Sequence, residues 1–494
     1  MPACAALIDT GNYPYGVRPA PWPIIPYMGE SMTAPGATRR WHEVVDGTAR
    51  LRHPSTAALA HLPGRRGLPL IGVMPEILKD PLGFSRRMTA DHGRVYRFHA
   101  FGHWHLHVTG PDANRTVLFD ESGIFSAREG WGQLIAPLFP GALLIKDGSE
   151  HRADRRLMGE AFKQAELSGY QAIFARDIST SLEAWTGRTI DTYAEIRKLT
   201  FRIAASTFLG VPLDEEAEVA IASLQGMIAS LLAMVKSPVP SLVRIKGRLA
   251  RARLEAILKR LIAEKRAAPD NDFLSRIALL RDDDGALLPV SRICESFAFL
   301  LSAAHDTLAS SLTSMIYQLA ANPGWSDALR AELDSVGIGD PLEAARAPLP
   351  LMDMVYKESL RLNGPAPVVW RRAARPFTVE GLRVPEGMMV GANLMMSHRL
   401  PDIWPNPEQF DPTRFSSEAE LARGRFAFIP FGAGVHKCLG MHFAQQQARI
   451  FAAMLLRAVD LRLASDQPVL WYQWPNARPR TPFRLVLSRR DRGR

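Results

Sequence analysis

Apolar residues recur at helical spacing through most of this chain. Between about residues 150 and 268 they fall three and four positions apart, in segments that are broken at Pro212, Pro238 and Pro240. Residues 290–319 form one long apolar helical pattern, which ends before Asn322-Pro323-Gly324. These patterns predict a protein built mainly from helices.

Alternating apolar and polar positions, which are typical of strands, occupy only short stretches. Residues 95–98 and 105–109 alternate on either side of a Phe-Gly turn and predict a hairpin. Residues 377–384 predict further short strands among prolines, and residues 470–487 are also strand-like. The predicted fold class is therefore mainly α with a small β portion.

One cysteine, Cys438, lies in a glycine-rich segment that directly precedes a predicted amphipathic helix at residues 441–456. A thiol at a helix N-terminus faces unpaired N–H groups and the positive end of the helix dipole, so we expect its thiolate form to be favoured. His436 can offer a donor or a positive charge to an anionic ligand. The segment also contains three glycines that would let a large flat ligand approach the backbone: Gly432, Gly434 and Gly440. Together these features predict a thiolate ligand for a haem iron.

A lone cysteine is most often a buried small hydrophobe, but the pattern Phe-x-x-Gly-x-x-x-Cys-x-Gly is far more restrictive. It resembles the haem-binding signature of the cytochrome P450 family, the haem-thiolate monooxygenases. The resemblance implies the cytochrome P450 fold, haem b (iron protoporphyrin IX) as cofactor, and Cys438 as the fifth ligand of the iron. It also implies that His436 binds a haem propionate and that Phe431 packs beside the sulfur.

A polar triplet, His305-Asp306-Thr307, interrupts the long apolar helix. Buried polar side chains need partners or a cavity, and Thr307 bonding back to a carbonyl one turn earlier is one solution. The segment resembles the oxygen-activation segment of the P450 family, which implies that Asp306 and Thr307 relay protons to the reacting oxygen. Ala304 stands where that family usually has glycine, so its methyl group would narrow the oxygen groove. His305 receives no role from the resemblance.

Glu358 and Arg361 lie three positions apart, so their charged groups can pair on one helix face. Such pairs are usually exposed and contribute less than about 1 kcal/mol. Together with Arg414 in Pro407-x-x-Phe-x-Pro-x-Arg-Phe415, however, they resemble the buried Glu-Arg-Arg network of the P450 family. The resemblance implies that this network supports the loop that leads to Cys438.

The same resemblance implies further contacts to haem and substrate. His151 and Arg155 fall on one helix face, and Arg371 follows Arg361 by ten residues. All three match propionate-binding positions of the family, and arginine suits carboxylates because of its planar donor fork. The implied substrate pocket is lined by apolar side chains from four stretches: Trp131, Leu138, Phe139, Phe299, Ala303, Val368 and Val369.

Composition narrows the setting. Three cysteines in 494 residues are too few for a disulfide framework, which favours a reducing compartment and hence the cytoplasm. Near the N-terminus no run of apolar residues is long enough for a transmembrane anchor. We expect residues 1–61 to be an irregular Pro-rich extension before a haem domain at residues 62–494. The net charge of +10 comes mostly from dispersed arginines without a nucleic-acid module, so we expect no nucleic-acid binding.

By resemblance, the protein is expected to insert one oxygen atom from O2 into an apolar molecule such as a terpenoid, steroid, fatty acid or polycyclic compound. No flavin or iron–sulfur module follows Cys438, so a separate ferredoxin or flavodoxin-like donor with its reductase is implied. Two other classes stay open. One is a haem-thiolate isomerase, dehydratase or peroxide-driven enzyme that needs no reductase, and the other is a non-catalytic haem or ligand-binding protein.

Overall fold

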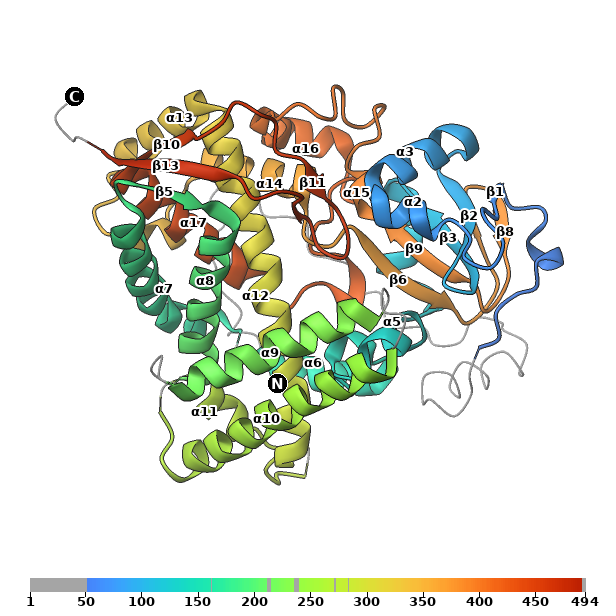
Figure 1. Ribbon diagram of the computed structural model, residues 1–494, viewed down its shortest axis with the longest axis horizontal. Helices are drawn as coiled ribbons and strands as arrows, with labels where there is room; N and C mark the ends of the chain where they lie inside the picture. Colours follow the sequence, from blue (N-terminus) through green and yellow to red (C-terminus); the bar gives the residue numbers. More distant parts are fainter. Residues whose placement is uncertain are drawn as a thin grey trace, which may run out of the picture.

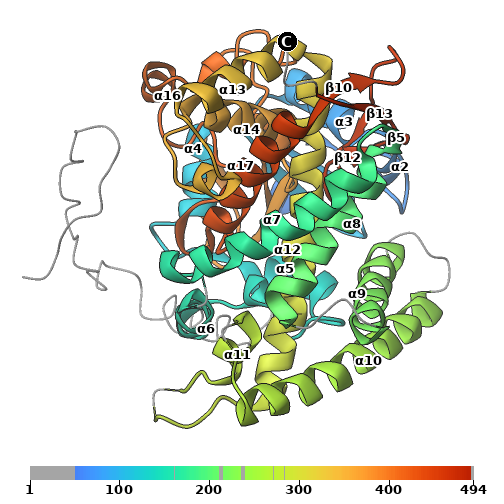
Figure 2. The same ribbon diagram turned by 90° about the vertical axis from the view of Figure 1, so that its left-hand side faces the viewer.

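The computed structural model describes residues 51–160, 162–210, 215–234, 240–270, 272–282 and 284–490. Helices form most of the molecule, and a twisted sheet lies at one edge (Figure 1). The long helix α12 (Val290–Ala321) passes through the middle and is crossed by the helices around it (Figures 1 and 2). The mainly α fold with a small β portion, as predicted from hydrophobic spacing, is confirmed.

The other helices frame α12. Those before it are α2 (Met74–Lys79), α3 (Pro81–His92), α4 (Pro111–Asn114), α5 (Ala127–Ile135), α6 (Gly148–Glu160), α7 (Gln164–Trp185), α8 (Thr192–Ala204), α9 (Glu215–Met234), α10 (Pro240–Ala267) and α11 (Phe273–Ala278). Those after it are α13 (Pro323–Ser335), α14 (Pro350–Asn363), α15 (Leu394–Ser397), α16 (Ser417–Arg423) and α17 (Met441–Ala458). Helices α9 and α10 pack side by side below the rest (Figure 2).

The larger sheet has six strands in the order β1-β2-β3-β9-β6-β4. These are β1 (Gly64–Arg65), β2 (Val95–Ala100), β3 (His103–Val108), β9 (Met389–Asn393), β6 (Val368–Ala373) and β4 (Phe125–Ser126). Strands β2 and β3 form the predicted hairpin, joined by Phe101 and Gly102, which both have positive φ. Strand β9 then pairs parallel to β3 and antiparallel to β6, so β6 is fixed in the sheet beside α5.

The smaller sheets lie mostly near the C-terminus. Strands β10 (Val459–Leu463), β13 (Arg484–Arg489) and β5 (Arg188–Asp191) form one. The hairpins β7 (Phe377–Val379) with β8 (Leu382–Val384), and β11 (Trp471–Tyr472) with β12 (Arg478–Pro479), form the others. The helical pattern at residues 150–268 did not predict β5. This strand has only four residues and forms because β13, from the other end of the chain, pairs with it.

Residues 51–61 pack against the main body rather than extending from it. Leu59 is fully buried in the cluster beneath the larger sheet. The indole of Trp104 donates to Thr56 (3.0 Å), and Arg372 donates to the carbonyl of Leu51 (2.7 Å). The rest of the predicted extension, residues 1–50, lies outside the described residues. Within the described ranges, none of the helices is both long and apolar enough to cross a membrane.

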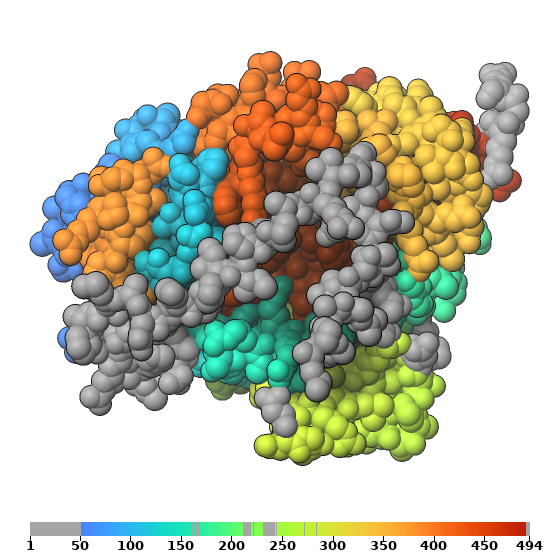
Figure 3. All heavy atoms as spheres, turned by 180° about the vertical axis from the view of Figure 1, so that it is seen from behind, coloured from blue at the N-terminus to red at the C-terminus, as the bar shows by residue number. Residues whose placement is uncertain are grey.

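The main hydrophobic core surrounds α12, α14 and α17. Leu312, Val355 and Phe451 are among its fully buried members, one from each helix. Because α12 is buried on both faces, apolar residues lie on nearly all sides of the helix. Seen from behind, atoms of α17 reach the surface between the orange segment that precedes it and the turquoise helix α6 (Figure 3). The start of α17, directly after Cys438, lies at the surface, because His442 is exposed.

Candidate active site

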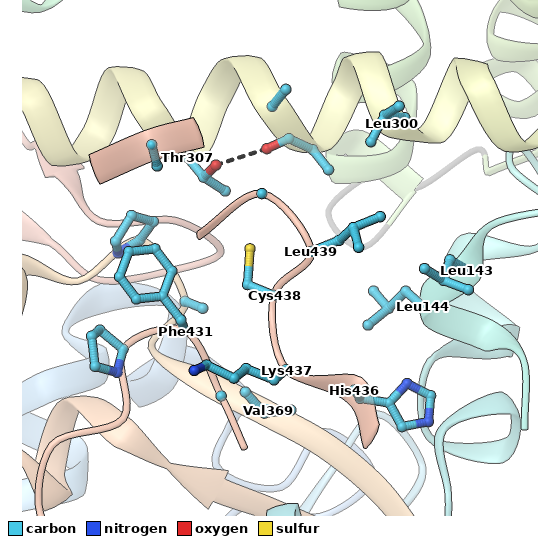
Figure 4. Close-up of a pocket in the computed structure, with 18 of the residues that line it drawn as sticks. Leu143, Leu144, Leu300, Thr307, Val369, Phe431, His436, Lys437, Cys438 and Leu439 are labelled. Atoms are coloured by element: carbon cyan, nitrogen blue, oxygen red, sulfur yellow. Dashed lines mark hydrogen bonds between the residues drawn. The ribbon is translucent and has the colours of Figure 1, made fainter. Parts of the chain in front are cut away.

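A cavity of about 400 Å³ separates α12 from the segment that carries Cys438. Leu300, Ala303 and Thr307 line it from α12, and the sulfur of Cys438 points toward them from the opposite side (Figure 4). Further apolar side chains close the walls, among them Leu143, Leu144, Met158 and Phe431. Cys438 and Thr307 of α12, which are far apart in the sequence, thus lie on opposite sides of the same cavity.

The glycines near Cys438 serve different purposes. Gly432 and Gly434 have φ of 72° and 64°, values that favour glycine. A Cβ at Gly434 would lie 2.5 Å from the carbonyl oxygen of Leu118, so this glycine permits contact between chain segments rather than with a ligand. At Gly440 the φ is −86°, and a Cβ would meet only Phe162, at 3.9 Å. Gly440 therefore leaves open space beside the sulfur.

A hydrogen bond closes the loop that carries Cys438, because the backbone N–H of Cys438 donates to the carbonyl of Phe431 (2.8 Å). Burial raises the pKa of Cys438, and the Gly440 amide, Arg155 and Lys437 only partly oppose the rise. For the polypeptide without haem this direction runs against the thiolate form that we expected at a helix N-terminus, because desolvation disfavours the charged sulfur. Iron that binds the sulfur would have to displace the proton.

Four basic side chains gather at one edge of the cavity: His151 and Arg155 from α6, Arg371 from β6, and His436. The His151 and His436 rings are 4.0 Å apart. Burial, together with Arg155 and Arg371, lowers the pKa of His151 to about 4. Burial also lowers the pKa of Arg371 to about 10 and strongly lowers that of His436. These basic groups oppose one another's charge. Asp147, whose Oδ1 lies 3.9 Å from Nε2 of His436, and Asp120 offset this only in part, so the site can take a further anion.

The donor set fits a haem. Among the described residues, no group of three or more His, Cys, Asp or Glu side chains could hold a metal ion. Cys438 would therefore supply one ligand, and a macrocycle would supply the others. The basic cluster lines the same cavity as the sulfur and would supply donors to the carboxylates of that macrocycle. Nε2 of His151 and Nε1 of Trp131 are buried and lack partners in the described part of the chain.

The three polar residues His305, Asp306 and Thr307 lie on different faces of α12. Thr307 lines the cavity, and its hydroxyl donates to the Ala303 carbonyl one turn earlier (2.7 Å; Figure 4). Ala304 also lines the cavity, whereas Asp306 turns aside toward Arg197 of α8 (3.6 Å). Burial acts to raise the pKa of Asp306, but His305 and Arg197 outweigh it and hold that pKa below its ordinary value.

The predicted substrate pocket is present only in part. Trp131, Phe299, Ala303, Val368 and Val369 line the cavity. Leu138 and Phe139 do not, which corrects their assignment: they are 2% and 1% exposed and belong to the core, where Phe139 packs on the edge of Phe299 at 5.8 Å. The chain after α5 turns inward, so these side chains face protein. Sequence reasoning missed Leu143 and Leu144, which lie in a 3₁₀ turn without a helical pattern.

Glu358, Arg361 and Arg414 lie together where α14 meets the 3₁₀ turn at Pro412–Phe415. Glu358 and Arg361 are fully buried and form a bidentate pair of 2.7 and 2.8 Å. Arg361 also donates to the carbonyls of His398, Pro407 and Gln409, while Glu358 accepts from the Asp411 amide (2.9 Å). Arg414 approaches Glu358 to 3.5 Å. The network therefore fixes α14 to residues 398–414.

A family model described as Cytochrome P450 matches residues 62–485. The chain belongs to the cytochrome P450 family. This P450 is 33% identical over 419 residues to the putative cytochrome P450 136 of Mycobacterium tuberculosis. The match covers 83% of this chain and 85% of that relative. It is 28% identical over 426 residues to cytochrome P450 26A1 of Xenopus laevis, which covers 83% and 86% of the two chains.

A solved structure titled "Retinoic acid bound cyanobacterial CYP120A1" resembles this P450 with a TM-score of 0.78 at 28% identity, covering 86% of this chain and 98% of that one. The heme domain of cytochrome P450DA, at 20% identity and a TM-score of 0.79, has the same fold. As a family member, the chain is a cytochrome P450 monooxygenase with haem as its cofactor. Bound haem supplies the activation of O2, from which one oxygen atom enters an organic substrate.

Proposed function

We propose that this P450 oxygenates a large, mostly apolar molecule, with Cys438 as the iron ligand. His151, Arg155, Arg371 and His436 would hold the haem carboxylates through charge-assisted hydrogen bonds. This assignment is supported by the buried basic cluster, which Asp147 and Asp120 only partly balance, on the same cavity as the thiol. Gly432 and Gly440, beside Phe431, would leave room for the macrocycle.

The apolar walls of the cavity carry the substrate proposal. Apolar side chains that line the cavity include Trp131, Leu144, Phe299, Leu300 and Val369. Such walls gain roughly 25 cal/mol for each Å² of apolar ligand surface they bury, and they penalise an unpaired charge. The cyanobacterial neighbour was solved with retinoic acid bound. We therefore place terpenoids of that size first among the candidates, before steroids, fatty acids and polycyclic compounds.

Spectral titration of the purified haem protein tests this proposal. Large apolar ligands, among them retinol, the uncharged counterpart of retinoic acid, should shift the iron from low spin to high spin. Small charged compounds such as citrate should have little effect. If citrate-like compounds alone shift the spectrum, the apolar-substrate proposal is wrong.

A matched pair of variants locates the binding site. Ala303→Phe fills the cavity opposite Cys438, so it should abolish the spectral response to large ligands while haem stays bound. Ala422→Phe adds the same side chain at an exposed position of α16 and should leave the response unchanged. An undiminished response in Ala303→Phe would place the ligand elsewhere.

We also propose that electrons come from a separate ferredoxin or flavodoxin-like protein. Arg152 and Lys437 are exposed near the cysteine segment and could meet an acidic partner. Arg449 is already paired with Asp353, which makes it a weaker candidate for binding the partner.

Variants of the exposed basic residues test this proposal with a surrogate redox system. Arg152→Glu and Lys437→Glu should slow reduction of the haem, whereas Arg484→Glu, at an exposed position of β13, should not. Product formed at full rate without any reductase would favour a peroxide-driven enzyme instead.

A further inference from the structure

Arg372 of β6 is a buried cation that joins three segments of the chain. Its side chain is 2% exposed. Nε donates to the carbonyl of Gly387 (3.0 Å), and Nη2 donates to the carbonyl of Leu51 (2.7 Å). Nη1 donates to the carboxylate of Glu129 on α5 (3.0 Å). Burial lowers the pKa of Arg372 and Glu129 opposes this shift, so Glu129 stabilises the buried charge.

The guanidinium of Arg372 does not touch the cavity itself. Side chains alternate between the two faces of a strand, and the preceding residue, Arg371, lines the cavity. Arg372 therefore points to the other face of β6 and can act on the cavity only through its partners.

Helix α5 connects Arg372 to the cavity wall. The helix lies beside β6 (Figure 1). Glu129 and Trp131 are two residues apart, so they lie on nearly opposite sides of the helix. Glu129 meets the guanidinium, whereas Trp131 lines the cavity. A short helix moves as a unit, so a displacement at Glu129 would carry Trp131 with it.

Other contacts of α5 are backbone contacts or an exposed ion pair. Asp147 accepts from the amide of Ala127 at the start of the helix (2.8 Å). A Cβ at Gly130 would lie 2.8 Å from a Cα atom of β6, so the helix packs closely on the strand. Arg128 pairs with Glu150 of α6, but these side chains are 31% and 47% exposed, so water screens the pair. The buried pair with Arg372 is thus the stronger ionic tie.

The beginning of the described chain completes the surroundings of Arg372. The carbonyl of Leu51 is one of the acceptors of the guanidinium. A Cβ at Gly387 would lie 1.9 Å from the carbonyl oxygen of Arg52, so residues 51–52 lie directly on the turn before β9. A change that lifts these residues would remove an acceptor from a buried charge.

We propose that Arg372 is a positioning residue for ligand binding, which holds α5 and the Trp131 wall of the cavity against residues 51–52. The inference rests on the proposed binding of a large molecule in this cavity. It makes Glu129 and Gly387, which do not line the cavity, determinants of how tightly large ligands bind. Small ligands that do not reach Trp131 would not depend on them.

Two azoles that bind haem iron through a ring nitrogen measure this effect without the natural substrate. Clotrimazole carries bulky aromatic groups that need room beside the iron, whereas imidazole carries none. Glu129→Ala should weaken clotrimazole binding by about tenfold and leave imidazole binding unchanged. Glu129→Gln retains an acceptor for Arg372 and should restore part of the loss. Glu121→Ala, which removes an exposed pair with Arg115, should change neither affinity.

A second pair of variants acts on the guanidinium from the side opposite α5. Gly387→Ala would place a methyl group against Arg52 and displace Leu51, so it should also weaken clotrimazole binding but not imidazole binding. Gly381→Ala introduces similar backbone strain, because φ is 73° there and 81° at Gly387. Its methyl group would meet nothing within 4 Å, so both affinities should stay unchanged.

The ratio of the two azole affinities decides the proposal. An unchanged ratio in either Glu129→Ala or Gly387→Ala would overturn it. Because both azoles bind the iron directly, the result stands apart from a failure of the proposed substrate class, which would appear as the absence of a spin shift with retinol in the wild type.

Discussion

Thr307 combines two hydrogen-bonding capacities in one hydroxyl. Its proton is donated to the Ala303 carbonyl, while its oxygen remains able to accept from a group in the cavity. The hydroxyl can thus hold a proton donor over Cys438 without unwinding α12. Asp306, one residue earlier, is turned toward α8 and would have to rotate to exchange protons with the cavity.

Replacement of Thr307 by alanine should therefore impair proton handling and spare binding. We expect the variant to bind haem and substrate normally but to form less product and more hydrogen peroxide for each electron pair consumed. Thr307→Ser keeps the hydroxyl and should stay near the wild-type ratio. The ratio of product to NAD(P)H is the measurement, and equal ratios in all three proteins would mean that the hydroxyl serves only the helix.

At the scale of residues, the sequence predicted most of the side chains that line the cavity, but not their orientation or their burial. The position of Cys438 before a helix follows from local glycine and hydrophobic patterns. Its raised pKa does not, because desolvation depends on what the whole chain packs around it. The sideways orientation of Asp306 and the burial of Leu138 and Phe139 likewise depend on α8 and on the fold of the segment after α5.

At the scale of elements, the Glu358–Arg361 pair connects α14 to the segment before the cysteine. Glu358→Ala would leave the fully buried guanidinium of Arg361 without its counter-charge. We expect a loss of roughly 3–5 kcal/mol in the free energy of unfolding, together with poor haem retention. Denaturant unfolding and the haem content of the purified protein measure both effects.

Glu420 provides a matched control on the same side of the molecule. It pairs with Lys357 at 2.8 Å, but the two side chains are 37% and 32% exposed. Glu420→Ala should therefore cost less than about 1 kcal/mol. If both variants lost a comparable free energy of unfolding, burial would not explain how much the Glu358 network stabilises the protein.

The elements themselves were predictable where their pattern is local. The β2–β3 hairpin follows from alternation around a tight turn, and α12 and α17 follow from long apolar periodicity. By contrast, β1 and β5 were not predicted. Each is a few residues long and exists through pairing with another part of the chain, β1 with β2 and β5 with β13. Such pairing has no signature within the strand itself.

At the scale of the whole molecule, two buried histidines should make folding sensitive to acid. His107 Nδ1 lies 3.2 Å from the Asn393 amide, and His398 Nε2 accepts from the Ile429 amide at 3.2 Å, so each ring uses a lone pair. Burial lowers the pKa of His107 to about 3, and burial together with Arg361 and Arg399 lowers the pKa of His398 to about 3. In the unfolded chain these histidines take up protons as the pH falls through about 6.5, whereas in the folded chain they stay neutral until a much lower pH.

Stability should therefore be complete above about pH 6.5 and fall as the pH drops toward 3, by roughly 1.4 kcal/mol per pH unit for each histidine. Unfolding measured between pH 7.5 and 5 should give a shallower dependence for His107→Gln than for wild type. His442→Gln, at an exposed position of α17, should leave the dependence unchanged. Equal slopes in all three proteins would mean that His107 does not titrate on unfolding.

The central claim is that Cys438 binds haem iron through its sulfur across the cavity from Thr307. The absorption spectrum of the reduced protein under carbon monoxide tests it most directly, with Cys438→Ala beside wild type. Wild type should show the strongly red-shifted Soret band of thiolate ligation, and the variant should lack it. A red-shifted band that survives in Cys438→Ala would contradict the account.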